Sequence, residues 1–244
     1  MIKDAKEVKA SSENIKVMVV GDYGTGKSVF GSSFPTPGHV FDIDKHILIY
    51  RSLDFSYSQY PLTSKGWVDF EKDLLEVAKK VEAGEIKTVI LDSTTALTDL
   101  AMERALQLDP KRNPSTQGPL WNVHYQIVKN LVEGKLRKLI SLECNLLINS
   151  HWRIVTDAET GAVISCEPML TGMLSAIIPG YFDEVYYAFN KMSEGKPEYY
   201  LRTLPRGFYK ARSCFSGKAQ LLPAEIPNDY NVLMEYINKG GEEG

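Results

Sequence analysis

The sequence has few of the residues that build disulfide frameworks and metal sites. Only three cysteines occur among 244 residues, far apart and without the paired spacing of a zinc site or an even-numbered disulfide framework. The histidines at positions 39, 46 and 124 show no metal-ligand spacing either. We therefore expect reduced thiols in a cytosolic protein, at Cys144, Cys166 and Cys214.

Long apolar runs are also missing. The longest, such as residues 17–20, fall far short of the roughly 18 residues that a membrane-spanning helix needs. The first 14 residues contain charges of both signs and no apolar segment, which is unlike a secretory signal. These absences argue against a membrane-spanning or secreted protein and predict a cytoplasmic location without membrane partners.

Glycine and proline occur at ordinary frequency, with 18 and 12 residues, and no linker rich in them divides the chain. No internal repeat of 20 to 50 residues is present. With 43% apolar residues the chain can bury one large core. We expect a main domain at residues 15–222, between a tail at 1–14 and an acidic tail at 223–244.

Neither sign of charge dominates, since 28 basic and 31 acidic residues give a net charge of −3. The charges are unevenly distributed along the chain. Residues 191–218 contain seven Lys/Arg and two Glu, whereas the residues after 218 contain five Asp/Glu and one Lys. A local basic patch can hold a polyanion. A solvated strand surface with long cationic side chains fits the same composition.

Short apolar runs rich in β-branched residues alternate with longer segments of helical period. Strands are expected at residues 15–20, 39–43, 88–91, 146–149 and 184–189, and helices at 27–33, 68–82, 94–107 and 120–143. This alternation predicts an α/β fold with a mainly parallel sheet flanked by helices. After about residue 181 the pattern changes to short strands and turns, including 207–215, which predicts an antiparallel hairpin extension. In the last helix, one buried stripe is expected from Trp121, Tyr125, Val128, Val132, Leu136 and Leu139.

Two segments interrupt this scheme. Residues 109–119 hold three prolines without an apolar period, and residues 152–168 are expected to be a flexible excursion around a turn at 159–161. Loops that follow sheet strands are where such folds usually bind ligands. We therefore expect Lys111, Arg112 and Arg153 to contact DNA phosphates if the protein binds DNA.

The most specific motif is G-x-x-x-x-G-K-[ST] at residues 21–28, which follows an apolar strand and opens a helix. Its glycines let backbone N–H groups turn around a phosphate, and the helix start adds its positive end. We expect Lys27 to bridge the β- and γ-phosphates of ATP and Ser28 to coordinate Mg²⁺. The nucleotide-binding residues are Gly21, Asp22, Tyr23, Gly24, Thr25, Gly26, Lys27 and Ser28.

Polar residues at the ends of three further strands complete the expected site. Asp92 ends the run TVILD and is the expected acidic partner that holds Mg²⁺ through water, although an aspartate before a helix is also a common N-cap. Asp44 is the first candidate for the carboxylate that activates the attacking water, and Asp42 is the second. His151 ends the strand beside Asp92 and is the expected γ-phosphate sensor. No guanine-specific N/T-K-x-D motif occurs, which leaves ATP or a triphosphate bound without a strong base preference.

In this order, the motifs GDYGTGKS, TVILD, NSHW and YKARSCF resemble the RecA-like P-loop ATPases. The likeness spans roughly residues 15–217 and is strongest to small phage-encoded nucleotide-binding proteins grouped with phage single-strand annealing ATPases. The resemblance implies a RecA-like P-loop NTPase core, a homo-oligomer in ring or filament form, and action on single-stranded DNA in a bacterial host. It also makes a single-strand binding protein a candidate partner.

The resemblance also points to a cation supplied by a neighbouring subunit. Relatives with a K-N-R-F-G motif use its Lys and Arg on the neighbour's nucleotide, and Lys210 and Arg212 match these charges. Here Ser213 and Cys214 separate Arg212 from Phe215, and Asp44 stands where the family commonly has a catalytic Glu. Two other functions stay open: a small-molecule phosphotransferase with residues 109–119 as a lid, and a nucleotide-gated interaction protein that does not hydrolyse ATP.

Overall fold

The computed structural model describes residues 14–216 and 222–241. Of the N-terminal tail expected at 1–14, all but Asn14 lies outside these residues, and so does Lys218 of the basic stretch. Within the described part of the chain, no helix has the length and apolar character to cross a bilayer.

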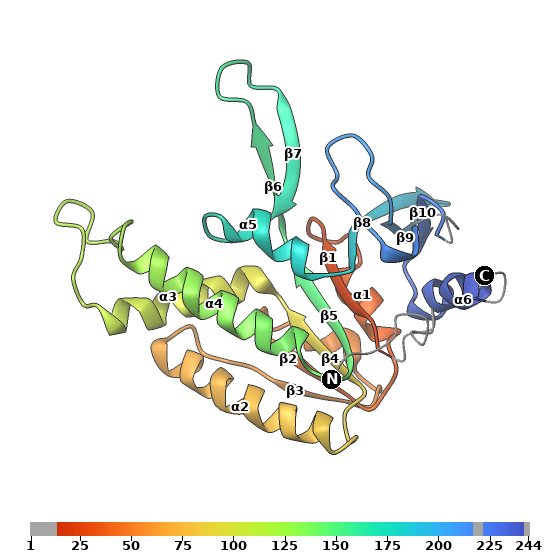
Figure 1. Ribbon diagram of the computed structural model, residues 1–244, viewed down its shortest axis with the longest axis horizontal. Helices are drawn as coiled ribbons and strands as arrows, with labels where there is room; N and C mark the ends of the chain where they lie inside the picture. Colours follow the sequence, from red (N-terminus) through yellow and green to blue (C-terminus); the bar gives the residue numbers. More distant parts are fainter. Residues whose placement is uncertain (1–13, 217–221, 242–244) are drawn as a thin grey trace, which may run out of the picture.

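The core is one eight-stranded sheet in the order β10-β9-β8-β1-β5-β4-β2-β3 (Figure 1). The six strands from β8 to β3 are parallel, and β9 and β10 extend the sheet in antiparallel fashion. This confirms the predicted α/β fold with a mainly parallel sheet and an antiparallel extension. The strands are β1 (Lys16–Val20), β2 (Gly38–Asp42), β3 (Phe55–Ser58), β4 (Thr88–Asp92), β5 (Asn145–Ser150), β8 (Glu184–Ser193), β9 (Lys196–Arg202) and β10 (Glu225–Pro227).

Helices cover both faces of the sheet because side chains of each central strand alternate between two apolar cores. Met18 and Val20 face the core under α2 to α5, whereas Val17 and Val19 face the core under α1 and α6. The six helices are α1 (Lys27–Ser32), α2 (Ser64–Glu82), α3 (Thr94–Leu108), α4 (His124–Ile140), α5 (Leu174–Ile177) and α6 (Tyr230–Gly241). Short 3-10 turns are η2 (Ile47–Tyr50), η3 (Ile178–Tyr181) and η4 (Cys214–Ser216).

Helix α4 begins four residues later than its pattern predicts. Buried His124 receives the Leu120 N–H at Nδ1 (2.7 Å) and bonds the Asp109 carbonyl through Nε2 (2.8 Å), which fixes both ends of the 109–119 loop. Trp121 therefore precedes the helix and is 69% exposed, so its expected place in the buried stripe is wrong. Val128, Val132, Leu136 and Leu139 are buried as predicted.

Residues 152–168 form a hairpin rather than an irregular excursion. Strands β6 (Trp152–Thr156) and β7 (Val163–Pro168) pair in antiparallel fashion and project from the body of the molecule (Figure 1). The expected turn at 159–161 is present, because Asp157 Oδ1 accepts the N–H groups of Glu159 (3.0 Å) and Thr160 (2.8 Å).

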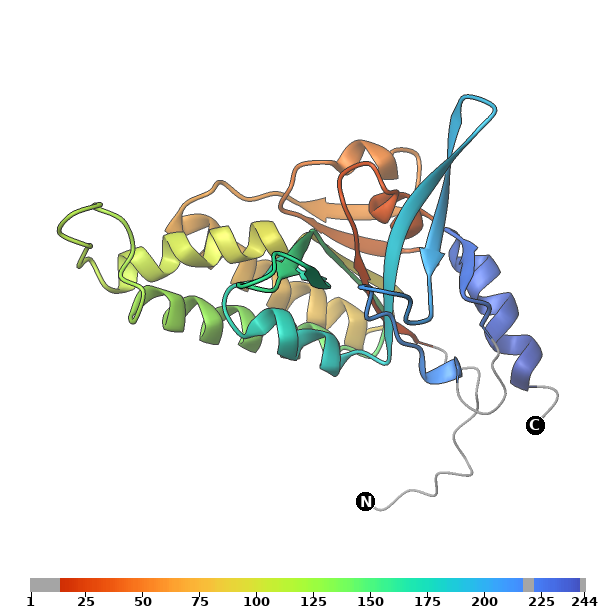
Figure 2. The ribbon, with the colours of Figure 1, turned by 90° about the horizontal axis from the view of Figure 1, so that it is seen from above.

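Within the expected acidic tail, the described residues up to 241 pack as part of the folded domain. Strand β10 pairs with β9, and apolar residues of α6 at helical spacing, Tyr230, Leu233 and Ile237, enter the same core as Phe30 of α1. Figure 2 shows α6 packed at the end of the sheet where β9 and β10 lie. The helix was not predicted because acidic residues dominate the composition of this segment. Three apolar residues at helical spacing nevertheless pack it onto the core.

Residues 207–215 do not form the expected strand. The chain turns at Gly207, and Arg212 only bridges Val185 of β8 through two backbone hydrogen bonds of 2.9 Å. Strand β9 already pairs with β8 from Tyr187 to Ser193, so residues 207–215 can pair only with the short unpaired part of β8 before Tyr187.

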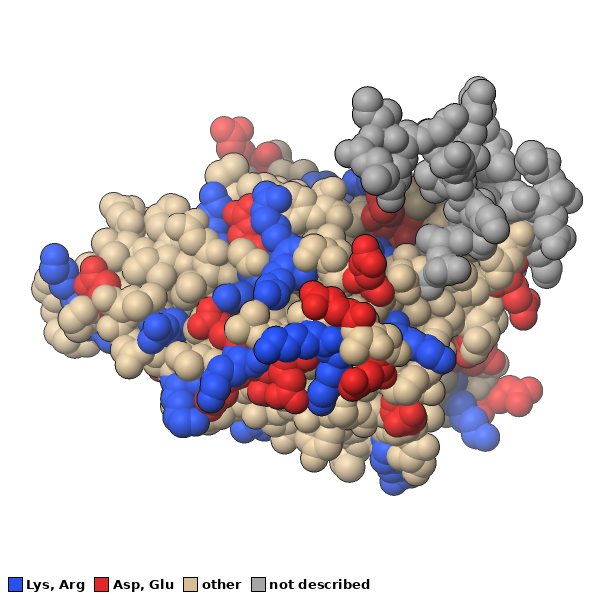
Figure 3. Space-filling view, turned by 60° about the horizontal axis from the view of Figure 1, so that its bottom comes forward, with Lys and Arg blue, Asp and Glu red and all other residues tan. Residues whose placement is uncertain are grey.

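Part of the basic stretch forms ion pairs with neighbouring carboxylates. Glu225 of β10 lies 2.9 Å from the ammonium of Lys191 and 3.3 Å from the guanidinium of Arg206, and these contacts lower its pKa. Arg202 stacks over the ring of Tyr209 at 4.4 Å. The face of α2 and α4 likewise intermixes both signs of charge (Figure 3). These contacts are compatible with a solvated strand surface that carries long cationic side chains.

The packing of α6 leads to a stability prediction. Leu233→Ala removes a fully buried side chain and should lower the free energy of unfolding by about 2 to 5 kcal/mol. Glu235→Ala on the exposed face of the same helix is the matched control. Urea unfolding followed by circular dichroism measures both, and equal stabilities would show that α6 does not contribute to the fold.

Candidate nucleotide site

The phosphate loop connects β1 to α1 at the carboxyl edge of the parallel strands. Gly24 and Gly26 have φ values of 68° and 87°, in the left-handed region that favours glycine. The start of the loop is tied to the neighbouring strand, because Gly21 N–H donates to the Ser150 carbonyl (3.1 Å). Thr25 Oγ1 closes the turn on the Asp22 carbonyl (2.8 Å).

Lys27 lies inside this loop and is only 8% exposed. Its ammonium donates to the carbonyls of Gly21 (3.0 Å) and Asp22 (2.8 Å). Burial lowers the pKa of Lys27, and the nearby carboxylates of Asp92 and Asp44 oppose that shift. The lysine is thus held at the centre of the loop, where a triphosphate would meet it.

Ser28 and Asp92 form the second part of the site. The Ser28 hydroxyl donates to Asp92 Oδ2 at 2.7 Å, and burial raises the pKa of this 4% exposed carboxyl. A hydroxyl and a carboxylate are the hard oxygen donors that Mg²⁺ prefers. Among the described residues, no group of three or more His, Cys, Asp or Glu side chains could hold a metal ion alone. The pair therefore fits a Mg²⁺ ion that takes its remaining ligands from phosphate and water.

The two candidate carboxylates of the second strand differ in their surroundings. Asp42 is 1% exposed, and its oxygens accept hydrogen bonds from His46 N–H (2.7 Å), Ile47 N–H (3.1 Å) and Gln59 Nε2 (2.6 Å). These bonds hold the turn after β2. Asp44 instead lines the nucleotide cavity.

Asp44 is poised as an ionised group. Its backbone N–H donates to the Asp92 carbonyl (3.1 Å), and its Oδ2 lies 3.8 Å from His151 Nε2. Burial alone would raise the pKa of Asp44, but interactions with His151 and Ser93 lower it below its usual value. The carboxylate is therefore charged at neutral pH.

His151 lies between this carboxylate and the phosphate loop. Its ring is 4.5 Å from the ring of Tyr23, which is 78% exposed. The buried Nδ1 atom finds no hydrogen-bond partner among the described residues. His151 thus lines the cavity beside Asp44 with one buried ring nitrogen that has no hydrogen-bond partner among the described residues.

The cavity itself has a volume of about 210 Å³. It is lined by Tyr23, Gly24, Thr25, Gly26, Lys27, Ser28, Val29, Asp44, His46, Asp92, His151 and Tyr199. The structure thus brings together most of the residues predicted from the motifs. Lys210, Arg212, Lys111, Arg112 and Arg153, all of them described, lie outside this lining.

Two asparagines of the C-terminal part of the chain, which the motifs do not indicate, form hydrogen bonds to the phosphate loop. Asn228 Nδ2 donates to the Gly26 carbonyl (2.7 Å) and Asn190 Nδ2 to the Gly24 carbonyl (3.0 Å). A Cβ on Gly26 would lie 2.7 Å from both the Tyr199 ring and the Asn228 amide, so glycine is required here. No local pattern indicates these contacts, because the partners are separated by more than 160 residues.

The fold and this site define a P-loop ATPase. A protein-family model described as an AAA domain matches residues 13–215, and the chain belongs to this family. Among solved structures, a KaiC-like protein from the hyperthermophilic archaeon Pyrococcus horikoshii OT3 matches 79% of this chain and 77% of its own, with 12% identity and a TM-score of 0.42. No curated protein matches the chain significantly.

The different surroundings of the two aspartates lead to a prediction. Asp44→Asn should leave ATP binding intact and slow hydrolysis by about 10²- to 10⁴-fold, because an amide is a poor base. Asp42→Asn should leave turnover nearly unchanged and lower the free energy of unfolding by about 1 to 3 kcal/mol, because an amide nitrogen would face the backbone donors. Phosphate release and urea unfolding of both variants separate the roles, and normal hydrolysis by Asp44→Asn would mean that another group positions the water.

Proposed function

We propose that this chain binds MgATP, hydrolyses it, and acts as a homo-oligomer on single-stranded DNA in phage recombination or replication. The observation that carries the proposal is the convergence of Lys27, Ser28, Asp92, Asp44 and His151 on one cavity at the carboxyl edge of the sheet. Membership of the AAA domain family supports the ATPase part. The DNA part rests on the motif resemblance and on the loops that follow the sheet strands.

In this proposal each group at the cavity has one task. The loop N–H groups and Lys27 bind the phosphates, with Lys27 exchanging its two carbonyl contacts for phosphate oxygens. Ser28 and Asp92 hold Mg²⁺, which supplies charge neutralisation of the β- and γ-phosphates when bound. Asp44 orients the attacking water, and His151 contacts the γ-phosphate and transmits its presence to the β6–β7 hairpin that begins at the next residue.

The three cations proposed to contact DNA phosphates, Lys111, Arg112 and Arg153, differ in how far their side chains are already engaged within the protein. Arg112 donates to the carbonyls of Leu106, Asp109 and Lys111, and Arg153 donates to Ser175 Oγ at 2.7 Å. The Lys111 side chain is exposed and pairs with no other described residue. Lys111 is therefore the strongest of the three candidates for a phosphate contact. We also propose a single-strand binding protein as a partner on the same DNA strand.

For hydrolysis, we propose that a neighbouring subunit supplies a cation through Lys210 and Arg212. Lys210 contacts Glu167 at 3.2 Å, whereas the Arg212 side chain is exposed and pairs with no described residue. Neither lines the cavity of its own chain, and the proposal therefore assigns both to the nucleotide of another copy. A cation supplied in trans can raise turnover by about 10³- to 10⁵-fold.

The alternative functions differ in what they require of the same site. For a phosphotransferase the 109–119 loop would have to act as a lid, yet these described residues contribute nothing to the cavity lining. A nucleotide-gated interaction protein would bind ATP with the same groups and not turn it over.

The rate of ATP hydrolysis with and without single-stranded DNA tests the proposal. We expect hydrolysis that DNA stimulates and that Lys27→Ala abolishes, because the variant loses the phosphate-binding ammonium. Turnover that depends on an added small-molecule acceptor would favour the phosphotransferase. Tight binding of ATP without turnover would favour the interaction protein.

Mixing two inactive variants tests the trans cation. Arg212→Ala should bind ATP with near-normal affinity and hydrolyse it slowly, and mixing it with Lys27→Ala should restore part of the activity. The mixed interface then pairs an intact phosphate loop with an intact Arg212. A mixture that stays inactive while light scattering confirms assembly would refute the assignment.

A further inference from the structure

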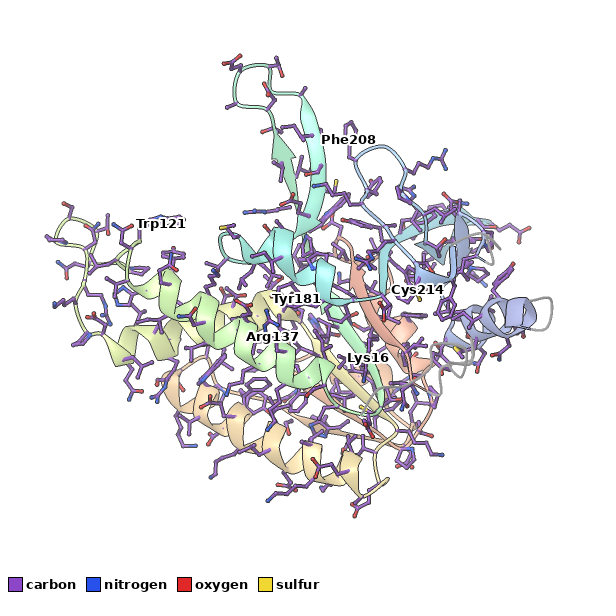
Figure 4. The ribbon with its side chains drawn as sticks, in the orientation of Figure 1. Lys16, Trp121, Arg137, Tyr181, Phe208 and Cys214 are labelled. Atoms are coloured by element: carbon purple, nitrogen blue, oxygen red, sulfur yellow. The ribbon has the colours of Figure 1, made fainter. Side chains whose placement is uncertain are left out.

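An exposed aromatic pair lies where α4 begins, away from the nucleotide cavity. Trp121 is 69% exposed (Figure 4). Its ring lies 4.5 Å from the ring of Tyr125 at a tilt of 41°. A single exposed apolar residue is ordinary on a protein surface, so the pair needs a second feature to indicate a site.

That second feature is a cavity of about 200 Å³ between the start of α4 and the turn that precedes α5. Trp121, Tyr125 and Met173 supply apolar surface, and Met173 is itself 68% exposed. Gln126 and Thr171 add hydrogen-bonding groups to the lining. A planar, partly polar group matches this combination better than an aliphatic chain does.

The charge at the cavity favours an anion beside that planar group. Lys129 lies one helical turn after Tyr125, lines the cavity, and makes no hydrogen bond or ion pair with any residue that the structure describes. The first turn of the 17-residue helix α4 carries no acidic residue, so its positive end is not neutralised locally.

We propose that this cavity binds one nucleotide of a single-stranded DNA, with the base stacked on Trp121 and the adjoining phosphate met by Lys129. An aromatic ring beside a cation is the general means of holding single strands without sequence preference. Duplex DNA does not fit, because its base faces are already stacked. The inference rests on the proposed function, since it names where that DNA is held.

The test uses the full chain with Mg²⁺, a non-hydrolysable ATP analogue and fluorescein-labelled oligo(dT), read by anisotropy. Trp121→Ala should weaken binding between about 5-fold and 150-fold, which corresponds to the loss of one stacked base. Trp121→Phe should retain most of the affinity. Tyr57→Ala on β3, where an aromatic side chain is 54% exposed, is the matched control and should bind normally.

Two further measurements separate stacking from phosphate contact. An oligonucleotide of abasic sites should bind the wild type and Trp121→Ala equally. Lys129→Ala should reduce the slope of log affinity against log salt by about 0.7, the contribution of one phosphate on a single strand. Thermal unfolding of each variant shows that the fold is kept.

The outcomes distinguish this inference from the proposed function. If the wild type binds oligo(dT) and Trp121→Ala binds it equally well, the cavity is not the nucleotide site while the DNA proposal stands. If the wild type binds no single-stranded DNA, the DNA proposal fails and this inference fails with it. If Trp121→Ala changes only the sedimentation of the DNA-free protein, the cavity is a contact between copies of the chain and the inference is overturned.

Discussion

The site depends on the parallel register of the central strands. In this register Val20 of β1 lies opposite Ser150 of β5, and Asp92 of β4 lies opposite both Asn149 of β5 and Asp42 of β2. Because parallel neighbours end at the same edge, whatever follows each strand must meet there. A phosphate loop, two acidic turns and a histidine that are far apart in sequence thereby come to share one cavity.

Burial then sets the chemistry of that cavity. Lys27 and Asp92 are both nearly excluded from water, and desolvation disfavours the charged form of each. The cavity thus holds its ammonium against carbonyl oxygens and its carboxyl against a hydroxyl, without a direct ion pair between them. Such weakly compensated groups gain most from a ligand that brings opposite charges, and a metal-bound triphosphate brings both signs.

The sequence predicted those parts of the structure that local pattern controls. The phosphate loop and the strands that end in Asp92 and His151 follow from residue spacing and apolar period, which short-range sterics enforce. Edge strand β3 escaped prediction because its four residues are half exposed and include two serines. The hairpin β6–β7 was not predicted because its two strands form a separate sheet outside the main one. The position of Trp121 was predicted wrongly because His124 ends the loop later than the apolar period suggests. The proposed roles of the site residues remain predictions.

The hold of Asn228 and Asn190 on the phosphate loop has a consequence for the order in which the protein matures. A chain leaves the ribosome from its amino end, and domains form as their segments become available. The loop at residues 21–28 is made early, yet two of its carbonyls find their amide partners only once residues 190 and 228 have been synthesised. The phosphate loop of the nascent chain therefore lacks these two contacts until residues 190 and 228 have been synthesised.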